Sequence, residues 1–487
     1  MQGGVRLVQL ESILQQRFGY SSFRLGQKEV IEQILNGKDV IALLPTGMGK
    51  SLCYQLPGYV LNKTVLVISP LLSLMQDQVD QMKLFGEKRV IALNSFLNKE
   101  EKNRVINGLE QYRFIFISPE MLAQRQVQQK LNRIELSLIV VDEAHCISQW
   151  GFDFRPDYLR IGEMFGTSRS PILALTATAT NKVLEDIELY LNMKEPFKYI
   201  HSVDRPNIHL SKMSFSNREE KLEWLFQHVS NTAGPGIIYT QSRSKTHSIS
   251  ETLLQNGISA ASYHGGMDLL DRQFIQQQFI EGTLDWIVAT NAFGMGIHKQ
   301  DVRQIIHESI PSNMANYMQE IGRAGRDGND AVAILLYSEH DEELAKFVGI
   351  DDLPLEQHVD IFEEYQRNGQ DATQMLKQGE ISETAFRVLN YWMEQKTPNE
   401  VKAIFQNMKI EKMQKVEEVM KLITSDTCMR ETLVHYFGQT LNDKPEQCCI
   451  NCGLDLAQLL KAKEEKNLSS FSMTWQERIT NLLTKKS

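Results

Sequence analysis

Residues 45–51, with the sequence PTGMGKS, have the composition and order of a phosphate-binding loop. They follow the apolar stretch DVIALL and precede an expected helix, so backbone N–H groups at the helix start would surround a phosphate. Lys50 would reach the β- and γ-phosphates of a nucleotide, and Ser51 would bind Mg²⁺. The general pattern has glycine where this chain has Leu44, and an ordinary strand-to-helix turn is the alternative. The loop predicts nucleotide contacts from Pro45, Thr46, Gly47, Met48, Gly49, Lys50 and Ser51.

A second candidate site is the acidic pair at the end of the apolar stretch LIVV. Asp142 would hold Mg²⁺ directly or through water, and Glu143 would orient or deprotonate the attacking water. Paired acids at the end of a strand are often only a solvated turn. Together with a phosphate-binding loop upstream, this pair indicates hydrolysis of a nucleoside triphosphate.

An aromatic-rich segment, QWGFDFRP, lies a few residues beyond the acidic pair. Its glycine, aspartate and closing proline argue against a strand and favour an exposed loop. Aromatic rings stack on any nucleic-acid base, at about 1–3 kcal/mol each, and a bound strand would bring the acidic pair and His145 into register. We expect Trp150 and Phe154 to face nucleic acid, whereas core packing of Trp150 and Phe152 is the alternative. The expected contacts are Gln149, Trp150, Phe152, Phe154 and Arg155.

Four of the six cysteines cluster toward the C-terminal end, at Cys428, Cys448, Cys449 and Cys452. Structural zinc sites prefer four thiolates in a tetrahedron, and clustered cysteines inside cells are more often metal ligands than disulfides. Adjacent cysteines can both bind one ion if the chain bends sharply. We therefore predict a structural zinc with no open position for catalysis. An empty, degenerate site and a mixed site that includes Glu446 or His435 are the alternatives.

These residues need elements that bring them together, and the first half of the chain alternates strands with helices. Apolar runs such as TVLVIS, RFIFIS, SLIVVD and ILALTAT are separated by helical stretches such as SLMQDQVDQMKLF. A second series, GIIYTQS, ISAASYH, DWIVAT, QIIHES and AVAILLY, follows the proline of VDRPNIH. Such alternation predicts parallel sheets with helices on both faces. From about residue 340 the pattern is nearly all helical.

The expected fold is therefore α/β, with two parallel-sheet domains followed by a mostly helical C-terminal region that includes a small zinc-binding module. We place the first domain, which holds the phosphate-binding loop, at residues 1–205 and the second at 206–342. A helical segment, a possible insertion, follows at 343–410, then a zinc-binding-like module at 411–455 and a charged tail at 456–487. The periodicity of ISETAFRVLNYWMEQ is typical of a packed helix and indicates no chemistry.

The composition of the 487-residue chain, with 42% hydrophobic and 23% charged residues, is typical of soluble globular proteins. The net charge of −9 argues against non-specific coating of nucleic acid but allows a narrow basic groove. No apolar run is long enough to cross a membrane, and the N-terminal residues lack the pattern of a secretion signal. We expect a cytoplasmic monomer, associated with the nucleoid if the source is bacterial.

The ordered motifs resemble those of the RecQ family of superfamily-two DNA helicases, densely over residues 10–340 and more sparsely toward the cysteines. They are FGYSSFRLGQKEVI, PTGMGKS, SPLLSLMQDQV, DEAHCISQWGFDFRP, ALTATA, IIYTQSR, ATNAFGMGIHKQDVR and QEIGRAGRDG. The resemblance implies two tandem RecA-like domains, with ATP and Mg²⁺ as cofactors and Zn²⁺ in the C-terminal module. It implies an ATP-dependent DNA helicase that moves 3′ to 5′ on single-stranded DNA and unwinds duplex or branched DNA in repair and recombination.

Other functions stay open at this point. An RNA helicase, or a DNA translocase that does not unwind, would use the same ATP site. A DNA-binding repair scaffold with a vestigial ATPase would not need Lys50, Asp142, Glu143 and Arg326 to be intact. Single-stranded and branched DNA are the expected partners, with single-strand-binding or recombination proteins as further candidates.

The resemblance also implies roles for residues on both sides of the acidic pair. Tyr20, Arg24 and Gln27 fall where the family contacts adenine, and the amide of Gln27 can both donate and accept hydrogen bonds. Packing of the N-terminal helix is the alternative for Tyr20 and Arg24. The threonines Thr176 and Thr178 of ALTATA are candidates for linking strand binding to hydrolysis.

The segment QEIGRAGRDG adds Gln319, Arg323 and Arg326 to the ATP site. We expect the two arginines one helical turn apart on one face, across a cleft from the phosphate-binding loop. Arg326 is the expected arginine finger and Arg323 a γ-phosphate sensor, whereas a surface helix with ion pairs is the alternative. ATP would then bind between the two domains and favour their closure.

The C-terminal region departs from the family pattern. CMRETLVHYFG resembles the helix that supplies the first zinc ligand, which is Cys428 here. The family's spacing C-x₂-C-x₂-C has Glu446 at its first position in this chain, and Cys448 is the expected replacement. The helical segment before the cysteines is longer than usual, and too few residues follow Gly453 for a winged helix. We therefore expect a short form without the winged-helix and further C-terminal domains.

Overall fold

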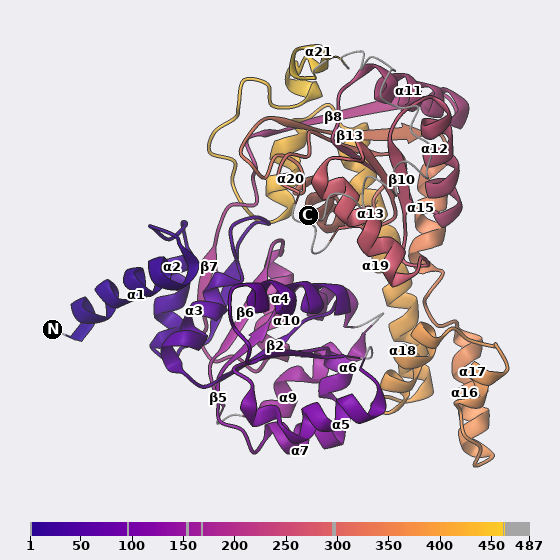
Figure 1. The fold of residues 1–487 in the computed structure, drawn as a ribbon. Helices are drawn as coiled ribbons and strands as arrows, with labels where there is room; N and C mark the ends of the chain where they lie inside the picture. Colours follow the sequence, from indigo (N-terminus) through magenta and orange to yellow (C-terminus); the bar gives the residue numbers. More distant parts are fainter. Residues whose placement is uncertain are drawn as a thin grey trace, which may run out of the picture.

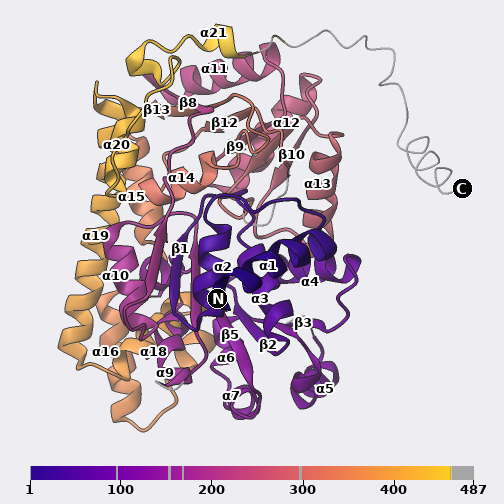
Figure 2. The ribbon, with the colours of Figure 1, turned by 90° about the vertical axis from the view of Figure 1, so that its left-hand side faces the viewer.

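The computed structural model describes residues 2–94, 97–151, 155–166, 169–294, 299–460 and 462. Two sheets, each with helices on its faces, lie one above the other in Figure 1. The C-terminal helices run along one side of both sheets (Figure 2). This arrangement confirms the expected fold class. Among the described helices, none is long and apolar enough to span a membrane.

The first sheet, within the described residues, has seven parallel strands in the order β3-β4-β2-β5-β6-β1-β7. Its central strands are buried along their length, as expected for a parallel sheet covered on both faces. The strands are β1 (Val40–Leu43), β2 (Thr64–Ile68), β3 (Val90–Leu93), β4 (Phe114–Ile117), β5 (Leu136–Val141), β6 (Ile172–Thr176) and β7 (Phe197–Ile200).

The helices around this sheet connect its strands in chain order. They are α1 (Gln2–Phe18), α2 (Gln27–Leu35), α3 (Leu52–Leu61), α4 (Leu72–Leu84), α5 (Lys99–Asn107), η1 (Leu109–Gln111), α6 (Pro119–Leu122), α7 (Arg125–Leu131), α8 (Cys146–Trp150), η2 (Pro156–Arg160), α9 (Ile161–Phe165) and α10 (Asn181–Tyr190). Because β5, β6 and β1 are neighbours, the segments that leave their carboxyl ends meet at one edge of the sheet.

The second sheet has the order β10-β11-β9-β12-β13-β8, and all its described pairings are parallel. Its strands are β8 (Ile208–Phe215), β9 (Gly236–Tyr239), β10 (Ala260–Tyr263), β11 (Trp286–Ala289), β12 (Gln304–His307) and β13 (Ala331–Ser338). Its helices are α11 (Arg218–Asn231), α12 (Arg243–Gln255), α13 (Leu269–Glu281) and α14 (Met314–Ile321).

The C-terminal region is helical, as expected, and one helix dominates it. These helices are α15 (Asp341–Ile350), α16 (Glu356–Arg367), α17 (Gln374–Lys377), α18 (Glu383–Met393), α19 (Pro398–Thr424), α20 (Met429–Tyr436), η3 (Ile450–Cys452) and α21 (Leu456–Leu459). With 27 residues, α19 is about 40 Å long and reaches from the first domain to the second (Figure 2). Helices α16, α18 and α19 share a separate apolar core that includes Phe362, Phe386 and Phe405.

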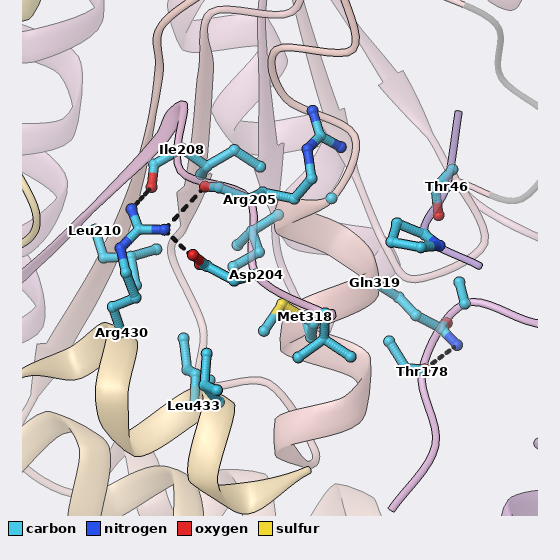
Figure 3. Close-up of a pocket in the computed structure, with 16 residues that line it drawn as sticks. Thr46, Thr178, Asp204, Arg205, Ile208, Leu210, Met318, Gln319, Arg430 and Leu433 are labelled. Carbon is cyan, nitrogen blue, oxygen red and sulfur yellow. Dashed lines mark hydrogen bonds and ion pairs between the residues drawn. The ribbon is translucent and has the colours of Figure 1, made fainter. Parts of the chain in front are cut away.

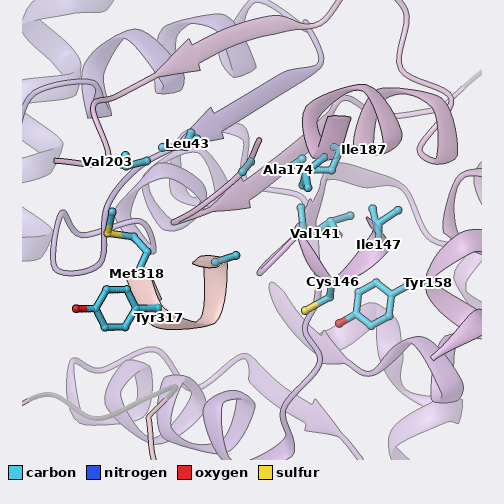
Figure 4. Packing of buried hydrophobic residues seen from close by; sticks show 14 of the residues in the cluster. Leu43, Val141, Cys146, Ile147, Tyr158, Ala174, Ile187, Val203, Tyr317 and Met318 are labelled. Carbon is cyan, nitrogen blue, oxygen red and sulfur yellow. The ribbon is translucent and has the colours of Figure 1, made fainter. Parts of the chain in front are cut away.

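One cluster of buried side chains continues from the first domain into the second. Figure 4 shows Leu43 and Val141 of the first sheet, Val203 between the sheets, and Tyr317 and Met318 of α14 in this cluster. The two domains are therefore packed against each other through apolar contacts on one side of the polar site described below.

Three strands were not expected from the sequence: β3, β7 and β8. All three are edge strands of their sheets. Strand β7 alternates between half-buried and exposed residues and therefore gives a weak sequence signal, whereas β3 is as apolar as the strands that were expected. The helix expected in MTWQERITNLL and nearly all of the charged tail lie outside the described residues.

Candidate nucleotide site between the two domains

The phosphate-binding loop joins β1 to α3 and is built around two glycines. Gly47 and Gly49 have φ angles of 91° and 73°, in the left-handed region that favours glycine. Met48 N–H donates to Pro45 O at 3.2 Å, which closes the turn before α3 begins. Backbone N–H groups at such a helix start have no partners within the helix and suit an anion. The loop expected from the sequence therefore has the required backbone shape.

The acidic pair lies at the carboxyl end of β5, next to this loop. Lys50 Nζ lies 3.7 Å from Glu143 Oε1, so the lysine of the loop faces the acid pair. Glu143 has a φ angle of 47°, which is uncommon for a residue other than glycine and occurs most often at functional sites. Its N–H donates to Asp142 Oδ1 at 3.0 Å, and this bond orients the Asp142 carboxylate relative to the Glu143 backbone.

The surroundings of the acid pair shift the pKa values of its two carboxyl groups in opposite directions. Burial, together with the adjacent Glu143 carboxylate, raises the pKa of Asp142 to about 6. Burial would also raise the pKa of Glu143, but Lys50, His145 and Arg323 outweigh it and hold that pKa below its ordinary value. Within the described part of the chain, the buried Glu143 Oε2 accepts no hydrogen bond. Carboxylate and hydroxyl oxygens are ligands that Mg²⁺ prefers, so Asp142 and Ser51 fit this ion.

A hydrogen-bond network connects the acid pair to both the ALTATA segment and the second domain. His145 Nδ1 lies 3.0 Å from Thr176 Oγ1, and Thr176 Oγ1 donates to Thr178 O at 2.9 Å. Gln319 Nε2 of α14 donates to His145 Nε2 at 3.0 Å and to Thr178 Oγ1 at 3.1 Å. Burial lowers the pKa of His145 to about 4, so the ring is neutral at pH 7 and can accept this bond.

The two arginines reach the site from the second domain, but not from one helix face. Helix α14 ends at Ile321, and both arginines lie in the turns that follow, where Gly325 has a φ angle of 54°. The expectation that they share a helical turn was wrong, because α14 ends before either arginine and the left-handed Gly325 lies between them.

Both arginine side chains nevertheless face the nucleotide site. Arg323 Nη1 donates to Gly294 O, and its charge helps to lower the pKa of Glu143. A Cβ atom placed on Gly47 would lie 3.8 Å from Arg326 Cγ, so Arg326 packs over the phosphate-binding loop. Burial, and then Arg323, lower the pKa of Arg326 to about 9, which leaves it charged at pH 7.

The residues expected at adenine contact the phosphate-binding loop directly. Gln27 Nε2 donates to Met48 O at 2.9 Å and to Gly49 O at 3.1 Å, while Gln27 Oε1 accepts from Arg24 N–H at 2.9 Å. The Arg24 guanidinium donates to Gly47 O. The Tyr20 side chain is 57% exposed, so it is not part of the helix packing that was its alternative role.

The aromatic-rich segment lies mainly outside the described residues. Helix α8 ends at Trp150, but the side chains of Gln149 and Trp150 and the whole of residues 152–154, with Phe152 and Phe154, are not described. Arg155 Nη1 donates to Pro70 O, and Arg155 Nε lies 3.3 Å from Glu120 Oε1. The arginine thus links this segment to SPLLSLMQDQV, and its contact with a DNA phosphate stays a prediction.

The four clustered cysteines come together as a candidate zinc site. Their sulfur atoms all lie within 4.8 Å of one another, and neither Glu446 nor His435 belongs to the group. Cys428 Sγ is 3.7 Å from Cys448 Sγ and 3.9 Å from Cys449 Sγ. Four thiolates about 2.3 Å from one zinc ion would be about 3.8 Å apart, so the donor set fits a tetrahedral zinc.

The helix that follows the first cysteine also holds the segment between the two domains. Arg430 of α20 is 2% exposed, and its Nη1 donates to Asp204 Oδ1 at 2.5 Å and to Arg205 O at 2.9 Å (Figure 3). Its Nη2 donates to Ile208 O. Sequence reasoning missed Arg430, because MRETLVHY carries several polar residues and nothing marks one of them as buried.

These contacts enclose a pocket at the junction of the two domains and the zinc module. Figure 3 shows Thr46 of the phosphate-binding loop and Gln319 of α14 on one side, with Arg430 and Leu433 of α20 on the other. The pocket therefore marks the place where the nucleotide site, the interdomain segment and the zinc module meet.

Comparisons with known proteins agree with this architecture. Residues 24–187 match the DEAD/DEAH box helicase family, residues 220–328 the helicase conserved C-terminal domain, and residues 386–453 the RecQ zinc-binding family. The chain is 41% identical to the "Probable ATP-dependent DNA helicase RecS" of Bacillus subtilis (strain 168) over 490 residues, which cover 98% of each protein.

A second relative matches over a shorter length. The chain is 44% identical over 334 residues to the "ATP-dependent DNA helicase RecQ" of Haemophilus influenzae, covering 68% of this chain and 53% of that protein. Among solved structures, the DUF1998 helicase MrfA bound to DNA and AMPPNP superposes with a TM-score of 0.56 at 19% identity, over 69% of this chain and 51% of that one. Mss116p bound to single-stranded RNA and AMP-PNP superposes with a TM-score of 0.57 at 17% identity, over 82% of this chain and 91% of that one. At these identities the two structures support the fold alone.

Proposed function

The chain belongs to the RecQ family of ATP-dependent DNA helicases, and from this premise we propose that it moves 3′ to 5′ along single-stranded DNA and unwinds duplex or branched DNA in repair and recombination. The observation that carries this proposal is the contact between Gln319 of the second domain and His145 beside the acid pair of the first. Through it, the arrangement of the two domains and the hydrolysis site can change together. We place the activity in the cytoplasm, at the nucleoid if the source is bacterial, in a monomer.

We assign the hydrolysis step to residues from both domains. Lys50 binds the β- and γ-phosphates, Ser51 and Asp142 hold Mg²⁺, and Glu143 orients or deprotonates the attacking water. The packing of Arg326 over Gly47 supports its role as an arginine finger, and such a group is worth roughly 10³–10⁵ in rate. The nearness of Arg323 to Glu143 supports its role as a sensor of the γ-phosphate.

Adenine recognition by Tyr20, Arg24 and Gln27 would couple the base to the phosphate-binding loop. The Gln27 amide already bonds to the loop carbonyls of Met48 and Gly49. A bound adenine would compete for, or share, the same donor. Base binding would therefore shift the loop that holds the phosphates.

DNA would act on the same site through the loop after α8 and through ALTATA. We propose that Trp150 and Phe154, with Gln149, Phe152 and Arg155 beside them, contact the single strand. Thr176 and Thr178 would transmit that contact, because both belong to the network of His145. ATP favours the closed arrangement by differential affinity, and hydrolysis releases it.

The zinc module would have a structural role. Four cysteine ligands leave no open position for a substrate, and zinc would fix the start of α20. Because Arg430 of this helix binds Asp204 and Arg205, zinc would also hold the segment between the domains. We keep the domain limits at residues 205 and 342 as part of this proposal.

Strand-separation assays on 3′-tailed, 5′-tailed and blunt duplexes, in DNA and in RNA, test the proposal. ATP-dependent separation is expected for the 3′-tailed DNA duplex, with little for the 5′-tailed and blunt forms. DNA-stimulated ATP hydrolysis without separation on any substrate would favour a translocase. Equal separation of RNA would favour an RNA helicase, and the absence of ATP hydrolysis with all substrates would contradict the proposal.

A further inference from the structure

Helix α18 of the C-terminal region contacts η2, the turn that follows the aromatic-rich segment of the first domain. We propose that Arg160 of η2, with Tyr391 of α18 and Glu394 directly after that helix, forms a positioning contact that couples DNA binding to ATP hydrolysis. This inference rests on the proposed function. It gives a role to a helix whose sequence indicated packing and no chemistry.

The guanidinium group of Arg160 contacts both a carboxylate and an aromatic ring. Arg160 Nη2 donates to Glu394 Oε2 at 2.7 Å, and Arg160 Cζ lies 5.0 Å from the centroid of the Tyr391 ring. A carboxylate and an aromatic face both attract a cation, and together they restrict where it can lie. The residues are more than two hundred positions apart in the chain, so the contact joins the first domain to the C-terminal region.

On the first-domain side, η2 is packed firmly against α8. Tyr158 of η2 is fully buried and lies beside Cys146, the first residue of α8 (Figure 4). A Cβ atom on Gly151 would lie only 2.7 Å from Leu159 Cδ2, so the end of α8 and η2 have no space between them. Helix α8 begins directly after His145. A displacement of η2 would therefore reach the hydrolysis site through α8.

On the other side, α18 leads into the long helix α19. The two helices share an apolar core, with Leu389 of α18 and Val401 of α19 both fully buried. Helix α19 then packs against α14, which carries Gln319, and against α20, which carries Arg430. The Arg160 contact thus joins the two domains by a path separate from the bond between Gln319 and His145.

Because Arg160 and Glu394 are partly exposed, their positioning role can be tested without unfolding the protein. The Arg160 and Glu394 side chains are 36% and 51% exposed, and ion pairs at this exposure add little to the stability of a fold. Variants at these two positions should therefore fold, bind zinc and hydrolyse ATP at the basal rate. Their effect should appear when single-stranded DNA is added.

The test compares Glu394→Gln, Arg160→Glu and the exchange variant Arg160→Glu/Glu394→Arg in the full chain. Basal and DNA-stimulated ATP hydrolysis are measured for each, with zinc content and thermal unfolding as checks on folding. We expect each single variant to lose about fivefold or more of the stimulation at unchanged basal rate, the lower end of usual coupling between sites. The exchange variant should recover most of the DNA stimulation. If the single variants only disturbed packing, the exchange would not restore it.

Glu383→Gln is the matched control. It removes the more exposed pair between Glu383 and Arg387 on α18, and should leave stimulation unchanged. Wild-type stimulation in both single variants, or an exchange variant no better than the singles, would overturn the positioning role. A wild-type protein that DNA does not stimulate would instead overturn the proposed function, so the two failures are distinguishable.

Discussion

At the scale of single residues, Lys50 Nζ lies 3.7 Å from Glu143 Oε1, but the two residues have different roles in the proposed hydrolysis. Lys50→Ala should weaken ATP binding, because the loop loses its one charged contact to the β- and γ-phosphates. Glu143→Gln should leave ATP binding close to that of the wild type and slow turnover by about 10²–10⁴, the usual loss of a general base. Titration with a fluorescent ATP analogue and steady-state hydrolysis separate the two effects.

These two substitutions also test the site as a whole. The unfolding temperature of each variant is the check on folding, since the two side chains are only 16% and 15% exposed. Substantial turnover in both variants would show that the phosphate-binding loop and the acid pair do not form the hydrolysis site.

Motif residues were predictable from the sequence where local spacing defines them, as in the loop of Lys50 and the pair Asp142 and Glu143. Contacts between distant segments were not. The bond of Gln319 to His145 depends on how two domains pack, and the contact of Arg430 with Asp204 depends on where α20 lies. The sequence pattern also suggested a helix around Arg323 and Arg326, but α14 ends at Ile321 and turns follow it.

At the scale of elements, α8 and η2 flank residues 151–155 in the chain, and α8 connects them to the acid pair. Trp150→Ala should keep basal ATP hydrolysis and lose DNA stimulation. Loss of one stacking ring corresponds to about 5- to 150-fold weaker response to DNA, from about 1–3 kcal/mol per base. The measurement is the DNA concentration that gives half of the maximal stimulation. Equal stimulation of a folded variant and the wild type would place Trp150 in the core instead.

The zinc module allows a separate prediction. Purified protein should contain about one zinc per chain, and Cys448→Ser should lower both the zinc content and the unfolding temperature, because a tetrahedral site loses one of four ligands. Glu446→Gln is the control and should keep its zinc, since Glu446 is not in the cysteine group. Less than a few tenths of a zinc per chain, in a protein with full ATPase activity, would contradict the site.

The sequence was a better guide to central elements than to edge elements. Buried strands such as β5 and β6 are uniformly apolar, and the alternation of strands and helices predicts parallel sheets. Edge strands such as β7 mix exposed and half-buried positions and carry a weaker signal. The course of α19 past both domains could not be predicted, because periodicity defines a helix and not its neighbours.

At the scale of the whole molecule, the proposed nucleotide site includes residues from both domains. The first domain supplies the phosphate-binding loop and the acid pair, while the second supplies Gln319, Arg323 and Arg326. Arg430 fixes the connecting segment, and α19 extends beside both domains. ATP hydrolysis and the relative position of the domains are therefore expected to change together, which is the basis of movement along a strand.

The substitution Arg326→Ala tests most directly whether ATP is hydrolysed between the two domains. It removes a side chain of the second domain, whereas the expected ATP contacts lie in the first. The measurement is ATP hydrolysis in saturating single-stranded DNA, alongside the affinity for a fluorescent ATP analogue. The account predicts affinity near that of the wild type and a fall in turnover of about 10³–10⁵. Turnover close to that of the wild type, in a variant that folds and binds ATP, would contradict hydrolysis between the two domains.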